Sequence, residues 1–197
     1  MKEHIIHIVD NVSWAEIEEE TMNECSWSPN SAPTAGFKAV LLKDEGLHVL
    51  LKSYAAPTRA ENTEPDSSVW QDSCLEFFFS FGEEKYVNLE VNSNSALRAS
   101  IGTERHGRTF LKDMDIPMPH VEAERTDDGW QVLFDISFET IKALWGCDVS
   151  AGDSFRANFY SCGDMTPAPH YASWSPIETE KPDFHRPEYF GLIKIEK

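Results

Sequence analysis

Basic residues are scarce in this 197-residue chain, which has 17 Lys and Arg against 34 Asp and Glu. The resulting formal charge of −17 argues against nucleic-acid binding, because contact with phosphates depends on Lys and Arg. The same charge disfavours binding to an anionic membrane surface. We expect the excess of acid to serve solubility, because net charge does not attract a neutral ligand.

Long apolar runs, internal repeats and low-complexity linkers are also missing. No stretch approaches the roughly 18–20 apolar residues that span a bilayer, so no membrane insertion is expected. The first residues, MKEHIIHIVDNVSW, do not resemble a signal peptide; the chain as written is expected to be cytoplasmic, or exported with its leader removed. We predict one domain over residues 1–197, with residues 1–30 as an N-terminal extension packed on it.

Cysteine is infrequent and lacks the spacing of metal-binding motifs. The four cysteines show no CxxC pair and no Cys/His pattern; they are Cys25, Cys74, Cys147 and Cys162. A structural zinc site is therefore not expected, and buried free thiols are the simplest interpretation. The sequence leaves open whether any of them form a disulfide.

What the chain does contain is a series of short β-type runs, and 41 % of its residues are hydrophobic. The predicted strands are separated by turn-forming clusters and cover residues 37–43, 47–54, 73–81, 85–91, 97–101, 120–125, 130–136, 155–162 and 189–195. Short helices are expected over 14–20 and 138–145, the second capped by Ser137. The pattern predicts an all-β fold, an antiparallel β-sandwich with one or two short helical insertions.

Alternation within these strands predicts one polar sheet face. If the strands at 73–81, 85–91 and 155–162 are neighbours, this face carries Glu76, Asn88, Glu90, Asn92, Arg156, Asn158 and Tyr160. Carboxylates, amides and guanidinium groups suit sugar hydroxyls, although an ordinary solvent-exposed sheet face would show the same alternation. Asn is a poor strand former on an exposed face, and Trp70 and Trp174 lie in loops; both observations favour a binding face.

Three motifs, in this order, resemble the carbohydrate-binding modules of family 9. They are residues 69–78 (VWQDSCLEFF), residues 86–97 (YVNLEVNSNSAL), and a C-terminal set at 156–159, 173–176 and 182–191. The resemblance extends over residues 27–194, most of the chain. It implies a β-sandwich of the DOMON-like, jelly-roll type that binds mono- or oligosaccharides without catalysis and supports polysaccharide or glycoside use, as in xylan- or glucan-related bacterial systems.

The resemblance also implies particular site residues. Family members hold a sugar between two tryptophans, and Trp70 and Trp174 match those positions. Glu76 matches the hydroxyl-binding carboxylate, while Asn158, or less closely Arg156, matches the polar group on the late strand.

The sequence departs from the family where a second pair of hydroxyl-binding residues is expected. Asn88 and Glu90 occupy the strand after Glu76, and Arg98 lies further along. Because hydroxyl recognition depends on donor placement, the sugar is not predicted. The acidic turn at residues 127–128 is a candidate calcium site, and no other cofactor is expected.

Two other functions stay open. Glu76 and Glu90 could form a carboxylate pair for glycoside hydrolysis. Some DOMON-like proteins bind haem through Met and His, and one loop-rich region holds such residues: Met114, Met118, His106 and His120. Residues 182–187 are expected to form a structural clasp in which Phe184 packs, with a site role for His185 or Arg186 as the alternative. The oligomeric state and the partner proteins are not predicted.

Overall fold

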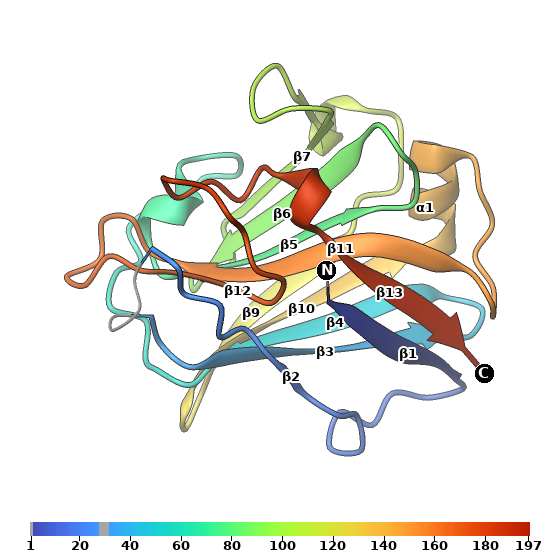
Figure 1. Cartoon of the computed structure of the whole chain (residues 1–197), viewed down its shortest axis with the longest axis horizontal. Helices are drawn as coiled ribbons and strands as arrows, with labels where there is room; N and C mark the ends of the chain where they lie inside the picture. The colour runs from blue at the N-terminus through green and yellow to red at the C-terminus, as the bar shows by residue number, and fades with distance from the viewer. Residues whose placement is uncertain (1, 28–31) are drawn as a thin grey trace.

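The computed structural model describes residues 2–27 and 32–197 (Figure 1). This part of the chain contains thirteen strands, one α-helix and three single-turn 3-10 helices. The strands form two packed sheets that are joined through a shared strand. Among the described residues, no helix is both long enough and apolar enough to cross a bilayer.

The first sheet, sheet A, carries the site described below. Its strands are, in spatial order, β8 (Thr109–Phe110), β7 (Leu97–Gly102), β6 (Tyr86–Asn92), β5 (Cys74–Ser80), β11 (Ser154–Cys162), β13 (Gly191–Glu196) and β1 (Glu3–Val9). A short strand, β12 (Tyr171–Ser173), pairs with the end of β11.

The second sheet, sheet B, completes the sandwich. Its order is β1, β3 (Ala35–Leu42), β4 (Gly46–Ser53), β10 (Gly129–Ser137) and β9 (His120–Thr126), with β2 (Glu20–Thr21) paired to β3. Strand β1 belongs to both sheets, because its first part pairs with β13 and its last two residues pair with β3. These two pairings are parallel, and the other strand pairs described are antiparallel.

The predicted antiparallel β-sandwich is therefore confirmed, and all nine predicted strands are present. Helix α1 (Phe138–Trp145) is also as predicted: the Ser137 side chain accepts a hydrogen bond from the Thr140 amide, and Gly146 ends the helix in the left-handed region at φ 71°. The helix expected over 14–20 is wrong, because this segment makes a turn and then enters the sheet as β2. The sequence pattern missed β1, β2, β8 and β12, of which all but β1 are two or three residues long.

The predicted N-terminal extension is partly outside the described residues, at residues 1 and 28–30. Within the described part, β1 lies inside the hydrogen-bonded network between β13 and β3. The assignment of 1–197 to one domain stays a prediction.

The main core lies between the two sheets. Leu75, Phe77 and Phe79 of β5 are fully buried there, as their alternation predicts. Phe159 of β11 stacks on Phe37 of β3 with ring centroids 3.6 Å apart, which joins the sheets through aromatic contact. Burial of this apolar surface is the main stabilising contribution.

The outer face of sheet A is buried as well. The segment between β12 and β13, residues 174–190, turns back over β11 and is called the covering segment below (Figure 1). Its Phe184 and Phe190 pack with Phe78 and Tyr160 in a second apolar cluster. The polar residues predicted on this face are correspondingly covered, and Glu76 is only 3 % exposed. An ordinary solvent-exposed sheet face therefore does not explain their alternation.

Candidate functional site

A cavity of about 270 Å³ opens on the outer face of sheet A. Four of the residues predicted for the site line it: Trp70, Glu76, Glu90 and Arg98. The rest of the lining comes from the loop after β7, the end of β11 and the segments on either side of β12; it includes Arg105, His106, Cys162, Asp164, Tyr171, Asp183, Phe184 and His185.

Strand register places the charged floor of the cavity in one row. Glu90 on β6 lies directly opposite Glu76 on β5 and directly opposite Arg98 on β7. Side chains at directly opposed positions of antiparallel strands share a face and lie about 5 Å apart at Cβ. Two acids and one base therefore meet in a line along the cavity floor.

The two carboxylates are held in a poorly solvated position. Burial, together with repulsion from Glu90, raises the pKa of Glu76 well above its usual value. Burial raises the pKa of Glu90 to about 7, although Arg98 and the hydrogen bond from Asn88 act in the opposite direction. Near neutral pH the pair therefore holds protons that two exposed glutamates would have lost.

Asn88 orients Glu90 from two positions earlier on the same face of β6. Its amide nitrogen donates to Glu90 Oε1 at 2.7 Å, while its oxygen accepts from the Ser100 hydroxyl at 2.6 Å and Arg108 Nε at 2.9 Å. Asn88 is 1 % exposed and does not line the cavity. The structure thus places Asn88 beside a cavity residue on the same face of β6, where it fixes the geometry of Glu90.

His185 provides an uncharged wall of the cavity. Its Nδ1 lies 2.9 Å from the Tyr86 hydroxyl, and its Nε2 lies 3.9 Å from Glu90 Oε1. Burial, together with the nearby Arg108 and Arg105, lowers the pKa of His185 to about 3, so the ring is neutral at pH 7. Burial also raises the pKa of Tyr86 to about 12, so Tyr86 keeps its proton and can donate it to Nδ1.

Trp70 forms the half-exposed aromatic edge of the cavity. It lies in the 3-10 turn η1 (Val69–Gln71) just before β5. The Arg98 guanidinium lies 5.1 Å from the centroid of the indole and 5.0 Å from that of Phe110, and Nη1 donates to the Asp66 carbonyl at 2.7 Å. Arg98 is thereby held by cation–π contacts with two rings and by one hydrogen bond.

A buried polar cluster holds the turn that carries Trp70. The carboxylate of Asp72 is fully buried and accepts hydrogen bonds from the Asn62 amide at 2.9 Å and from Asn92 Nδ2 at 2.7 Å. Arg59 pairs with the same carboxylate. This cluster ties the loop before η1 to the end of β6.

The segment before β13 covers the opposite side of the cavity. Phe184 stacks on Tyr160 with ring centroids 4.1 Å apart, so the predicted clasp does contain a packed Phe184. Asp183 pairs with Arg105 at 3.1 Å, which connects this segment to the loop after β7. Tyr171, half-buried at the start of β12, contributes a second aromatic ring to the lining.

Trp174 lies in the main core and not at the cavity, where the sequence prediction placed it. Its indole is fully buried in the main core, edge-to-face with Phe37 and Phe159 at 5.5 and 5.8 Å, and its Nε1 donates to Glu20. Trp174 does not line the cavity, and its buried indole has no exposed face on which a ligand could stack.

Asn158 and Arg156 also lie outside the cavity lining. Asn158 is fully buried and bonds both backbone polar groups of Ser175, at 3.0 Å from Nδ2 to the carbonyl and 2.8 Å from the amide to Oδ1. Arg156 donates to the carbonyls of Glu188 and Phe190. Both side chains fasten the covering segment to β11.

The other candidate ligands are dispersed over several elements. Asp128, proposed for calcium, pairs with Lys52 at 2.9 Å. Among the haem candidates, Met118 is exposed, Met114 packs against the main core, and His106 lines the cavity; His120 begins β9 in sheet B. The calcium and haem alternatives gain no support from these positions.

A β-sandwich with a recessed cavity of aromatic and charged side chains defines a ligand-binding module. The family model described as carbohydrate-binding family 9 matches residues 4–195, and the chain therefore belongs to that family. A comparison with curated proteins found no match.

Solved structures agree on the fold. A protein from Bacteroides uniformis ATCC 8492, to which carbohydrate binding has been assigned, is 24 % identical, with a TM-score of 0.82 and 99 % of both chains covered. A family 9 carbohydrate-binding module from Caldicellulosiruptor kristjanssonii, solved with glucose, is 17 % identical, with a TM-score of 0.67 over 99 % of this chain and 96 % of that one. The same module was solved with cellotriose, where 94 % of its chain is covered.

Proposed function

We propose that this protein binds a neutral mono- or oligosaccharide, or the end of a glycan, in the cavity without altering it. The observation that carries the proposal is the row of Glu76, Glu90 and Arg98 beside the half-exposed indole of Trp70. An indole accepts the apolar face of a pyranose, while carboxylate and guanidinium groups bind its hydroxyls.

The size and lining of the cavity favour a short ligand. At about 270 Å³ it lies near the lower end of ligand pockets, which span about 300 to 1,000 Å³. We propose Tyr171 as the second aromatic surface in place of Trp174, because Tyr171 lines the cavity and is partly exposed. Glucose and cello-oligosaccharides are the first ligands to test, since the Caldicellulosiruptor module was solved with both kinds.

The placement of the carboxylates supports binding over hydrolysis. Glycoside hydrolases flank the scissile bond with their two carboxyl groups. Glu76 and Glu90 instead lie side by side at opposed positions of one sheet face, both on the floor of the cavity. Membership of a binding family supports the same choice.

Calorimetric titration with glucose, cellobiose and cellotriose tests the proposal. We expect micromolar to millimolar affinity, and Trp70→Ala should weaken it at least tenfold, about 1.4 kcal/mol. Trp14→Ala is the matched control, because Trp14 is also half-buried but lies outside the cavity lining. The proposal fails if a broad panel of sugars gives no binding, or if Trp70→Ala binds as tightly as the wild type. Release of new reducing ends would point to hydrolysis.

A further inference from the structure

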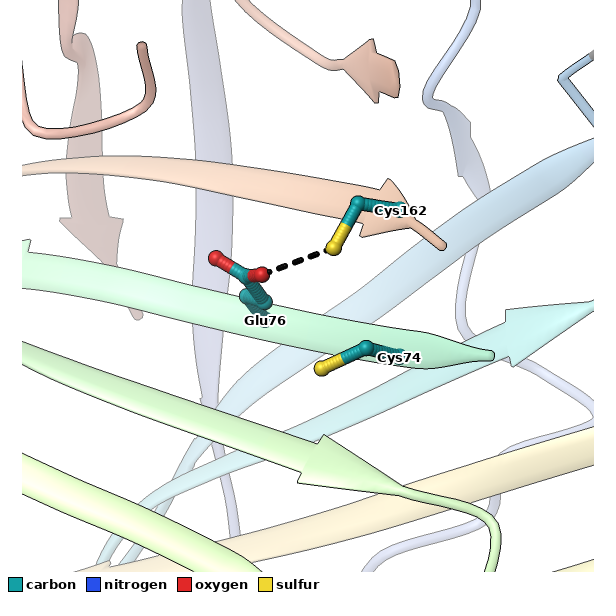
Figure 2. A group of neighbouring side chains, drawn as sticks. All are labelled: Cys74, Glu76 and Cys162. Carbon is teal, nitrogen blue, oxygen red and sulfur yellow. Dashed lines mark hydrogen bonds between the residues drawn. The ribbon is translucent and has the colours of Figure 1, made fainter. Parts of the chain in front are cut away.

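Three side chains of types that bind metal ions lie close together on sheet A, and two of them, Glu76 and Cys162, line the cavity (Figure 2). Cys74 and Glu76 are two residues apart on β5 and therefore share a face. Cys162 on β11 pairs directly with Cys74. Strand register thus assembles a group that the spacing of the cysteines in the sequence does not indicate.

The geometry of this group is close to that of a metal site. One ligand atom from each residue lies within 4.8 Å of the others, and the Cys162 thiol is 3.0 Å from Glu76 Oε1. In Figure 2 the Cys162 sulfur and the Glu76 carboxylate point toward each other. A tetrahedral zinc with Zn–S of about 2.3 Å and Zn–O of about 2.1 Å would hold such atoms about 3.6 to 3.8 Å apart. Small side-chain rotations are therefore enough to close the site.

We propose that Cys74, Glu76 and Cys162 bind a thiophilic divalent cation of the zinc type, with its fourth coordination position open to the cavity. Two thiolates select a soft or borderline cation over calcium or magnesium. Three protein ligands and an open position leave room for a water molecule as the fourth ligand.

Burial keeps these three groups protonated, so a cation has to replace their protons when it binds. Cys74, Glu76 and Cys162 are 1, 3 and 2 % exposed. Burial raises the pKa of Cys74 to about 12 and raises that of Glu76 well above its usual value, so without a cation these groups keep their protons. Binding would release the two thiol protons and the carboxyl proton, and the cation would offset two of the three resulting negative charges.

The cation also has a way in. Glu76 and Cys162 line the cavity described above, and Cys74 and Cys162 line a second cavity of about 160 Å³. Cys162 therefore lies between two hollows.

A consequence concerns the ligand. A bound cation would occupy the Glu76 oxygen proposed for a sugar hydroxyl, so metal and sugar should compete, with the apparent sugar affinity at least tenfold lower at saturating metal. This consequence rests on the proposed function, whereas the metal site does not. Metal binding is therefore measured first, with no sugar present.

The experiment titrates the reduced, metal-free protein with Co²⁺ and follows the visible bands of tetrahedral cobalt and the thiolate-to-cobalt charge-transfer band. We expect these bands in the wild type and in Cys25→Ser/Cys147→Ser, the matched control that keeps the proposed site. They should be absent in Cys74→Ser/Cys162→Ser, and zinc should displace the cobalt. Glu76→Gln, which keeps both thiols, should weaken binding about tenfold or more, since even outer-shell changes cost that much.

Several results would overturn the proposal. One is the lack of any cobalt–thiolate band in the folded, reduced wild type. Another is an unchanged band in folded Cys74→Ser/Cys162→Ser; should that variant not fold, unchanged affinity in Glu76→Gln would count equally against the site. A third is a Cys74–Cys162 disulfide in the protein purified without reductant, found by peptide mass, together with no metal uptake after reduction. Cobalt binding without sugar competition would uphold the metal site and count against Glu76 as a sugar ligand.

Discussion

Strand β5 buries both of its faces, but with opposite chemistry. Leu75, Phe77 and Phe79 face sheet B and add apolar contact, which stabilises the fold. Glu76 on the other face meets Glu90 under the covering segment, and both carboxylates have raised pKa values. Burying carboxylates costs free energy. The inner face therefore stabilises the sandwich, while the outer face carries buried carboxylates at a cost in stability, which fits the ligand site proposed there.

The sharpest test of this division is Trp174→Ala on the inner side. Its fully buried indole packs on Phe37 and Phe159, so truncation should lower the free energy of unfolding by about 3 to 5 kcal/mol. Denaturant unfolding measures the loss, and calorimetry on the folded fraction should find the sugar affinity unchanged. Loss of sugar binding with near-normal stability would mean that Trp174 contributes to ligand binding and not mainly to the core.

The converse test is Glu90→Gln on the outer face. In the unfolded chain Glu90 ionises near its usual pKa of 4.5, whereas in the folded protein it keeps its proton to about pH 7. Stability should therefore fall as pH rises through this window, by about 3 kcal/mol from this group, and Glu76 should act in the same direction. The stability of the Glu90→Gln variant should fall less than that of the wild type between about pH 5 and pH 8. The variant should also bind sugar more weakly.

Unfolding curves at several pH values decide this point. Parallel loss of stability in wild type and variant would mean that Glu90 does not titrate as proposed. Arg98, Arg108, Asn88 and His185 face the same carboxylate and remain in the variant, whereas Glu76 loses its repulsion from Glu90, so the comparison reports the titration of the carboxylate pair.

The strand part of the site could be predicted from the sequence, because alternation with a period of two decides which face each side chain takes. Glu76 and Glu90 were placed together on that basis, and register then paired them. The same register explains what was missed: Cys74 and Cys162 are distant in sequence and meet only because β5 and β11 are neighbours.

Loop residues could not be placed in the same way, because a loop has no period to decide its direction. Trp174 follows β12 directly, and its amide bonds the Phe159 carbonyl, which turns the indole into the core. Tyr171 at the start of β12 and Phe184 in the covering segment reach the cavity only through the path that the chain takes after β11. The sequence does contain several aromatic residues at 171–190, which indicates that this segment packs on the sandwich. It does not indicate which of these side chains enter the core and which line the cavity.

A smaller effect should come from Asp72, which holds the edge of the outer face. Asp72→Asn removes the buried charge that receives Asn62, Asn92 and Arg59, and should lower the free energy of unfolding by about 2 kcal/mol. Because this cluster fixes the turn carrying Trp70, sugar affinity should also fall, but less than in Trp70→Ala. Asp128→Asn is the control: its carboxylate pairs with Lys52 at an exposed site, so stability and affinity should change little. Normal sugar affinity in Asp72→Asn would mean that the Asp72 cluster is not needed to position Trp70. The other residues around the cavity would then be enough to hold the indole in place.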